Sequence, residues 1–169
     1  MIGGTGDDSL WGGADQDVLY GNQDADVLYG NQGIDTLYGG QDADVAYGNL
    51  ADDVMYGNLG ADSLYGGQGN DLLQGNLGDD TLQGGLGADL FAIGDGGGSD
   101  VVSDFDGGSG DTIRIATDVN CSRIDSFAEL VTAASDTDAG VQIALGGGNT
   151  LTLNGVTVSQ LQSGWFTFG

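Results

Sequence analysis

Residues 3–38 read GGTGDDSLW (3–11), GGADQDVLY (12–20), GNQDADVLY (21–29) and GNQGIDTLY (30–38). The same nine-residue phrase continues without insertion or deletion to GGLGADLFA (84–92). All ten copies have Gly at position 1, Gly or Asn at position 2, Asp at position 6 and an apolar residue at position 8. Composition alone does not produce ten copies in one register, so this stretch decides the fold.

The phrase is the pattern G-G-x-G-x-D-x-U-x, so residues 3–92 resemble the calcium-binding nonapeptide repeats of RTX proteins. The resemblance implies an all-β fold, a right-handed parallel β-roll in which odd and even repeats form two facing sheets. We divide the chain into the roll (1–92), a degenerate repeat and acidic linker (93–113), and a small, mostly-β capping and secretion domain with one short helix (114–169).

The chain is strongly acidic, with 26 acidic and 2 basic residues and a formal net charge of −24. This charge excludes the basic surface of a nucleic-acid binder and opposes docking on anionic lipid. All the acids but Glu129 are Asp, a residue typical of turns and of hard-cation sites. With 35 glycines and no proline, the composition also allows a disordered tail, which we expect for the metal-free chain.

Each nonapeptide divides into a six-residue loop and a three-residue strand. Gly at positions 1, 2 and 4 permits left-handed backbone angles, which Asn and Asp also tolerate. Ala51 is the poorest fit at position 4, and we expect strain or a weaker site there. Because strand residues alternate between faces, position 8 should form a thin core from Leu10 to Phe91.

Stacked turns should bring each position-6 Asp about 4.8 Å from the Asp 18 residues away. At that distance two carboxylates repel by about 0.9 kcal/mol in water and about 3.5 kcal/mol at an effective dielectric of 20. Ten repeats make eight such pairs, so the total exceeds or rivals a typical stability of about 5–15 kcal/mol. We therefore expect the roll to need cations, about eight in number. Calcium suits such loops because it accepts six to eight oxygens, main-chain carbonyls included.

The resemblance implies two groups of calcium ligands, the position-6 carboxylates and loop carbonyls that we assign to positions 2 and 4. The carboxylates are those of Asp8, Asp17, Asp26, Asp35, Asp44, Asp53, Asp62, Asp71, Asp80 and Asp89, with Asp100 of the degenerate repeat. At position 2 the carbonyls belong to Gly4, Gly13, Asn22, Asn31, Gly40, Asn49, Asn58, Gly67, Asn76 and Gly85. At position 4 they belong to Gly6, Asp15, Asp24, Gly33, Asp42, Ala51, Gly60, Gly69, Gly78 and Gly87.

Position 9 places aromatic residues on both outer faces: Trp11, Tyr20, Tyr29, Tyr38, Tyr47, Tyr56 and Tyr65. Ordinary β-propensity explains them. The alternative is a contact surface of fixed pitch for a glycan or for another protein.

After residue 92 the register of nine is lost. Gly96-Gly97-Gly98-Ser99-Asp100-Val101 reads as a degenerate repeat, and Asp104, Asp106 and Asp111 are candidates for a further calcium site within 95–111, with ordinary acidic turns as the alternative.

The sequence from residue 111 onward predicts a strand at 111–116, a helix at 126–134 with Ser126 and Glu129 as a capping box, and a hairpin of 141–145 and 150–153. A helical turn at 159–161 and a final aromatic strand should follow. This order resembles the C-terminal domains of type I-secreted proteins, which implies an uncleaved export signal. The alternative is a simple cap for the last turn of a solenoid.

We find no catalytic constellation, because the chain has no His or Lys and a single Cys, Cys121. MIGGTGDDSL has no features of a signal peptide, and no stretch suits a membrane span. The resemblance to type I-secreted proteins implies secretion through type I machinery to the outside of a bacterial cell. Our first hypothesis is a non-enzymatic calcium-binding module, disordered without calcium and forming the C-terminal part of a larger secreted protein. The second is an extracellular structural or adhesive protein that self-associates or binds glycans through its aromatic residues.

Overall fold

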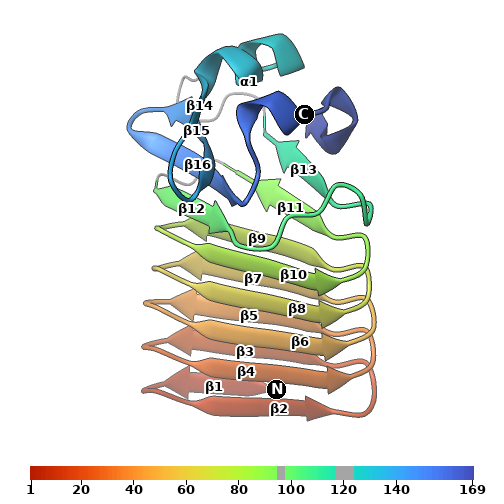
Figure 1. The fold of residues 1–169 in the computed structure, drawn as a ribbon. Helices are drawn as coiled ribbons and strands as arrows, with labels where there is room; N and C mark the ends of the chain where they lie inside the picture. Colours follow the sequence, from red (N-terminus) through yellow and green to blue (C-terminus); the bar gives the residue numbers. More distant parts are fainter. Residues whose placement is uncertain (95–97, 117–123) are drawn as a thin grey trace.

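The computed structural model describes residues 1–94, 98–116 and 124–169, and the chain forms a column of stacked strands with a wider C-terminal end (Figure 1). Two predictions fall outside the described residues: Gly96 and Gly97 of the degenerate repeat, and Cys121. Within the described residues, no helix combines the length and apolarity that crossing a membrane requires.

The nonapeptides alternate between two facing sheets, as the repeat predicts. In the described residues the 8-stranded sheet has the order β1 (Ile2–Thr5), β3 (Val18–Gln23), β5 (Thr36–Gln41), β7 (Val54–Leu59), β9 (Leu72–Leu77), β11 (Leu90–Ile93), β13 (Thr112–Ile115) and β17 (Phe166–Phe168). The 9-stranded sheet has the order β14 (Ala134–Asp136), β15 (Gly140–Gly146), β16 (Asn149–Asn154), β12 (Ser99–Val102), β10 (Thr81–Leu86), β8 (Ser63–Gln68), β6 (Val45–Leu50), β4 (Val27–Gln32) and β2 (Ser9–Gly13).

Within the repeats every strand pairs in parallel with the strand 18 residues away, so identical positions stack. Leu10 pairs with Leu28, and Tyr38 pairs with Tyr56. Because position 8 faces inward in every repeat, the column contains a line of buried side chains from Leu10 to Phe91, each at most 2% exposed. Ala46 and Met55, both fully buried, also lie on this line.

The strands are longer than the three residues that the sequence predicts. β4, for example, runs over positions 7, 8, 9, 1, 2 and 3 of the phrase, and Asn31 and Gln32 pair with Asn49 and Leu50. The physical reason is the identical backbone in stacked turns, which keeps main-chain hydrogen bonds in register through the Gly and Asn positions. Positions 4–6 alone form the turn.

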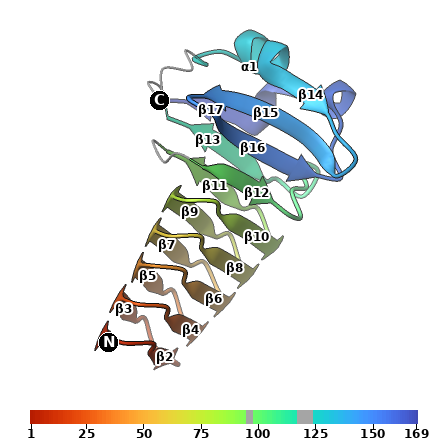
Figure 2. The same ribbon diagram turned by 90° about the vertical axis from the view of Figure 1, so that its left-hand side faces the viewer.

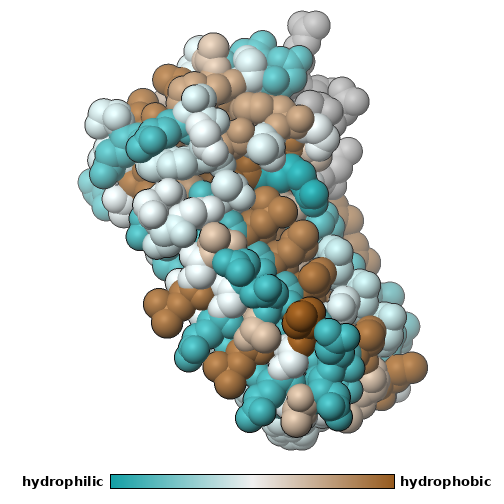
Figure 3. All heavy atoms as spheres, turned by 90° about the vertical axis from the view of Figure 1, so that its right-hand side faces the viewer, coloured by the Kyte–Doolittle hydropathy of each residue, from teal (hydrophilic) through white to brown (hydrophobic). Residues whose placement is uncertain are grey.

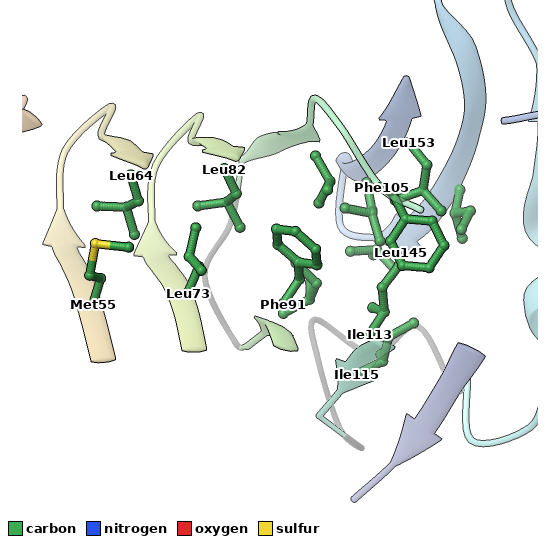
Figure 4. Close-up of a cluster of buried hydrophobic side chains, with 14 of the residues drawn as sticks. Met55, Leu64, Leu73, Leu82, Phe91, Phe105, Ile113, Ile115, Leu145 and Leu153 are labelled. Atoms are coloured by element: carbon green, nitrogen blue, oxygen red, sulfur yellow. The ribbon is translucent and has the colours of Figure 1, made fainter. Parts of the chain in front are cut away.

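Both sheets continue after the register of nine ends. β12 adds to β10 with a spacing of 20 residues, and β13 adds to β11 with a spacing of 22. β16 then extends one sheet and β17 the other, both in parallel. The core is equally continuous, since Phe105, Ile113, Leu145 and Leu153 carry on from Phe91 (Figure 4).

The C-terminal residues cover the last turn of the column (Figure 2). The predicted hairpin is present as antiparallel β15 and β16, joined through three glycines with positive φ. The predicted helix is α1 (Phe127–Ala133), whose N-cap Ser126 accepts a hydrogen bond from the N–H of Glu129. Two short 3-10 helices, η2 (Val158–Gln160) and η3 (Ser163–Trp165), precede β17, and Trp165 packs edge-on against Phe105.

Candidate metal centre

The position-6 aspartates form two rows along the column, which we call the first and second carboxylate ladders. In each ladder the backbone N–H of one Asp donates a hydrogen bond of 2.7 to 3.2 Å to Oδ1 of the next. The first ladder contains Asp8, Asp26, Asp44, Asp62, Asp80 and Asp100. The second contains Asp17, Asp35, Asp53, Asp71, Asp89 and Asp111.

The other carboxylate oxygen of most ladder residues is buried without a partner. Oδ2 has no hydrogen bond in Asp8, Asp26, Asp35, Asp44, Asp53, Asp62, Asp71, Asp80 and Asp89. From Asp26 to Asp89 these residues are at most 2% exposed. A buried carboxylate oxygen without a donor or cation is costly. Because the same unpartnered carboxylate oxygen recurs in nine residues, it indicates a binding site that a cation would complete.

Glycine at position 1 makes room for that carboxylate. A Cβ added at Gly21 would lie 2.3 Å from Oδ2 of Asp26 and 2.5 Å from the carbonyl oxygen of Gly39 in the stacked turn. The prediction that position 1 needs left-handed angles is wrong, because the position-1 glycines are not among the residues with positive φ. Close approach of two oxygens is the reason for Gly here, and this carbonyl was not among the predicted ligands.

Positions 2 and 4 do adopt left-handed angles. Asn22 has φ +87°, Asp42 has φ +71° and Ala51 has φ +81°, whereas Asp15 is not among the positive-φ residues. Their carbonyl oxygens lie against the stacked turn: a Cβ added at Gly40 would be 2.3 Å from the oxygen of Asn22. Whether these carbonyls ligate a metal stays a prediction.

Burial raises the pKa of the ladder carboxyls from Asp26 to Asp111, and neighbouring carboxylates add to the increase. The pKa of Asp53 and of Asp62 rises to about 7, and that of Asp44 to about 6. Desolvation is the largest cause, the N–H of the preceding ladder residue opposes it, and adjacent ladder carboxylates raise the pKa further. Without a cation, then, the folded ladders disfavour the charge that Asp carries at neutral pH.

The donor set fits calcium better than a transition metal. In the described ranges, no group of three or more His, Cys, Asp or Glu side chains lies close enough to hold an ion. Side-chain carboxylates alone are therefore too few at any one point, and a bound cation would need main-chain carbonyl oxygens as well. A mixed set of carboxylate and carbonyl oxygens is typical of calcium sites.

Asp111 extends the second ladder, which the sequence analysis missed. Its Oδ1 accepts from the N–H of Asp89 at 3.0 Å and its Oδ2 accepts from the N–H of Asp106 at 2.8 Å. The local signal was present, because Asp111-Thr112-Ile113 repeats the order of positions 6 to 8. The spacing of 22 residues concealed it.

The other two candidates of that cluster bind backbone groups elsewhere. Asp104, which lies just beyond the end of β12, accepts from the N–H groups of Gly84 and Gly85 in β10. Asp106 accepts from Gly108 and Ser109 within its own turn, and the Ser109 hydroxyl is the main reason why its pKa is lowered. The structure thus separates Asp106 from Asp111 in role, although the two are close in sequence.

The position-9 aromatic residues form two stacked rows, one on each outer face. Trp11, Tyr29, Tyr47 and Tyr65 stack on the 9-stranded sheet, with ring centroids 5.0 to 5.7 Å apart. Tyr20, Tyr38 and Tyr56 stack on the 8-stranded sheet at 4.9 and 5.0 Å. Stacking on one another gives these residues a structural role. That they also bind a glycan or another protein stays a prediction.

Comparison with known proteins points to one family. The sequence model of the RTX calcium-binding nonapeptide repeat matches residues 1–28, 29–64, 56–91 and 65–102. Among solved structures, the chain is similar to the AlgE6R3 subunit from the Azotobacter vinelandii mannuronan C5-epimerase, with a TM-score of 0.54 and 28% identity, over 75% of this chain and 78% of that chain. Comparison with curated proteins gave no match. Of the twelve ladder carboxylates, only Asp111 lies beyond the segments that the family model matches.

Proposed function

Because the chain belongs to the family of RTX calcium-binding nonapeptide repeats, we propose that it is a secreted module that is disordered without calcium and folds when it meets extracellular calcium. The family model and the similar solved structure support the β-roll fold and the calcium-binding repeats. That calcium drives folding and that the chain is exported are our own proposals.

One observation carries the proposal, the row of buried Oδ2 atoms without partners. Asp53 and Asp62 lie within the column at 1% and 2% exposure, each with one bonded and one unpartnered oxygen. Ionised carboxylates in such a place oppose folding unless a cation compensates them. Where metal binding supplies this compensation, its free energy becomes folding free energy.

The position-6 carboxylates would hold the ions together with carbonyls from two stacked turns, about eight ions in the repeats. Bound calcium would supply positive charge that turns carboxylate repulsion into ligation. Asp100 and Asp111 would extend the same arrangement into the C-terminal residues, since each receives the N–H of the preceding ladder residue.

Residues 114–169 would then serve as the cap of the column and carry the signal for type I secretion. The capping role is supported by β16 and β17, each of which adds to the end of one sheet. A chain that remains unfolded at the low calcium of the cytosol could pass through the secretion machinery and fold outside, where calcium is millimolar.

The module itself would have no catalytic role. The ladder carboxylates from Asp26 and Asp35 onward accept backbone N–H groups, the proposed ions would use their remaining oxygens, and the chain offers no His or Lys as a partner in catalysis. One structural neighbour is a subunit of a mannuronan C5-epimerase, which supports the idea that this chain serves a larger protein in the same way.

The deciding experiment is far-UV circular dichroism during a calcium titration, with magnesium as the control. A cooperative change from disorder to β-structure with calcium alone is expected. Asp62→Asn should shift the midpoint to higher calcium, whereas the matched change Asp138→Asn, outside both ladders, should not. A spectrum already rich in β-structure in the presence of a chelator would contradict calcium-driven folding.

A further inference from the structure

The outer face of the 8-stranded sheet carries a groove that the proposed calcium sites do not use. One wall is the Tyr20 and Tyr38 pair at position 9, and the other is the Gln23 and Gln41 pair at position 3. The groove has a volume of about 400 Å³ and continues toward Leu59 on the next strand. It therefore crosses β3, β5 and β7 and runs along the column.

The groove follows from the backbone at position 2, which forms its floor. Asn22 has φ +87° and Gly40 has φ +133°, so the chain changes direction between positions 9 and 3 of each repeat. Gly40 has no space for a side chain, because a Cβ would be 2.3 Å from the carbonyl of Asn22. At Gly40, therefore, no side chain fills the space beside Tyr38 and Gln41, which line the groove.

The lining combines apolar surface with uncharged polar groups, although the chain carries a net charge of −24. The Tyr hydroxyls and Gln amides that line the groove form no side-chain hydrogen bonds within the described part of the chain. Aromatic edges with free hydroxyl and amide groups are typical of sites that bind molecules rich in hydroxyl groups. No Lys or Arg lines the groove, so an anionic ligand would meet repulsion without compensation.

The spacing of the lining groups indicates a polymer. Tyr20, Tyr38 and Tyr56 recur at 4.9 and 5.0 Å along the column, which is close to the length of one hexose unit in an extended polysaccharide. Each strand would thus present the same phenol and amide groups to successive sugar units.

The other surfaces of the column fit such a ligand less well. The corresponding groove on the 9-stranded sheet is lined by Asn31, Gln32, Leu50 and Leu86 among others, without an aromatic residue. The edge formed by the turns after the even-numbered strands shows hydrophobic residues interspersed with hydrophilic ones (Figure 3).

We propose that the groove along Tyr20, Tyr38, Gln23 and Gln41 binds an uncharged, extended polysaccharide. Binding needs the folded column, so it rests on the proposed function, but its test can fail separately. Circular dichroism in calcium is recorded first. If the chain is folded and does not bind, the groove inference fails and calcium-driven folding is untouched.

The test is affinity electrophoresis of the full chain in calcium, in native gels that contain hydroxyethyl cellulose or a polyuronate. We expect retardation by the neutral polymer and none by the polyuronate. Tyr38→Ser should weaken binding about tenfold, because a hydroxyl bond and ring contact are lost. Tyr47→Ser is the matched control, since Tyr47 is also in the middle of a stacked row but on the opposite sheet.

Three results would overturn the proposal. The first is no retardation by the neutral polymer with a folded chain. The second is an equal loss of binding in Tyr38→Ser and Tyr47→Ser, and the third is retardation by the polyuronate alone. Sedimentation of the same samples identifies self-association, which without polymer binding would assign the aromatic rows to contacts between copies.

Discussion

Oδ1 of Asp111 accepts a 3.0 Å hydrogen bond from the N–H of Asp89, across 22 residues of chain and one turn of the column. Asp89 makes the equivalent bond with Asp71 at 2.9 Å, across 18 residues. The second ladder therefore passes from the regular repeats into the C-terminal residues without a break. The stacking of strands therefore determines which aspartates are bonded in a ladder, and the number of residues between two bonded aspartates can vary.

Replacing Asp111 should weaken this junction. Asp111→Ala leaves the N–H groups of Asp89 and Asp106 without an acceptor, and each such loss costs about 1–3 kcal/mol. We expect the free energy of unfolding in calcium to fall by about 2–6 kcal/mol. Urea denaturation in calcium measures it, and Asp106→Ala, at an exposed turn, should cost less than about 1 kcal/mol. Equal effects of the two substitutions would contradict the role of Asp111 as a ladder residue.

Position 1 should not accept a side chain. A Cβ at Gly57 would lie 2.2 Å from Oδ2 of Asp62 and 2.8 Å from the carbonyl oxygen of Gly75. Gly57→Ala should displace the carboxylate and destabilise the folded chain by about 1–3 kcal/mol, as overpacking does. The calcium midpoint measured by circular dichroism should rise accordingly. Gly164→Ala is the control, because a Cβ there meets nothing within 4 Å, and an unchanged midpoint for Gly57→Ala would be evidence against a fixed carboxylate.

Ala51 should be a point of removable strain. Its φ of +81° lies in the left-handed region, where a Cβ costs about 1 kcal/mol or more. We expect Ala51→Gly to raise the melting temperature in calcium and to stabilise the chain by about 1 kcal/mol. Ala61→Gly, one position further along its own repeat and without positive φ, should instead destabilise it slightly. A stabilisation common to both variants would contradict local strain at Ala51.

The calcium-free chain should gain stability on acidification. The pKa of Asp53 and of Asp62 is about 7 when folded, against 3.8 for an ordinary Asp, so the folded state binds more protons between these values. Stability should be lost as the pH rises through about 7 and be fully present below about 4, changing by about 1.4 kcal/mol per pH unit for each extra proton. Circular dichroism in chelator from pH 8 to pH 4.5 should therefore show β-structure increasing, whereas at fixed calcium acidification should weaken calcium binding. A chain in chelator whose β-structure decreases on acidification would rule out protonation of the ladders as a stabilising event.

The sequence allowed good prediction where the register of nine held. Alternation within each strand placed the core line from Leu10 to Phe91, and spacing placed Asp26 beside Asp44 two repeats later. Prediction failed where a residue type had more than one physical explanation. Gly21 was assigned to backbone freedom, yet its lack of a Cβ serves the approach of the Asp26 carboxylate and the Gly39 carbonyl.

The amino-acid sequence by itself determined the two facing sheets, the inward line at position 8 and the stacking of the position-6 carboxylates, because a period of nine without insertions brings like residues together in every turn. Tertiary structure alone decided how the ladders end. Asp111 joined the second ladder and Asp104 took the free N–H groups of Gly84 and Gly85. Both outcomes depend on where β12 ends and β13 begins against the last repeat, and a chain of irregular spacing does not encode that contact in any local pattern.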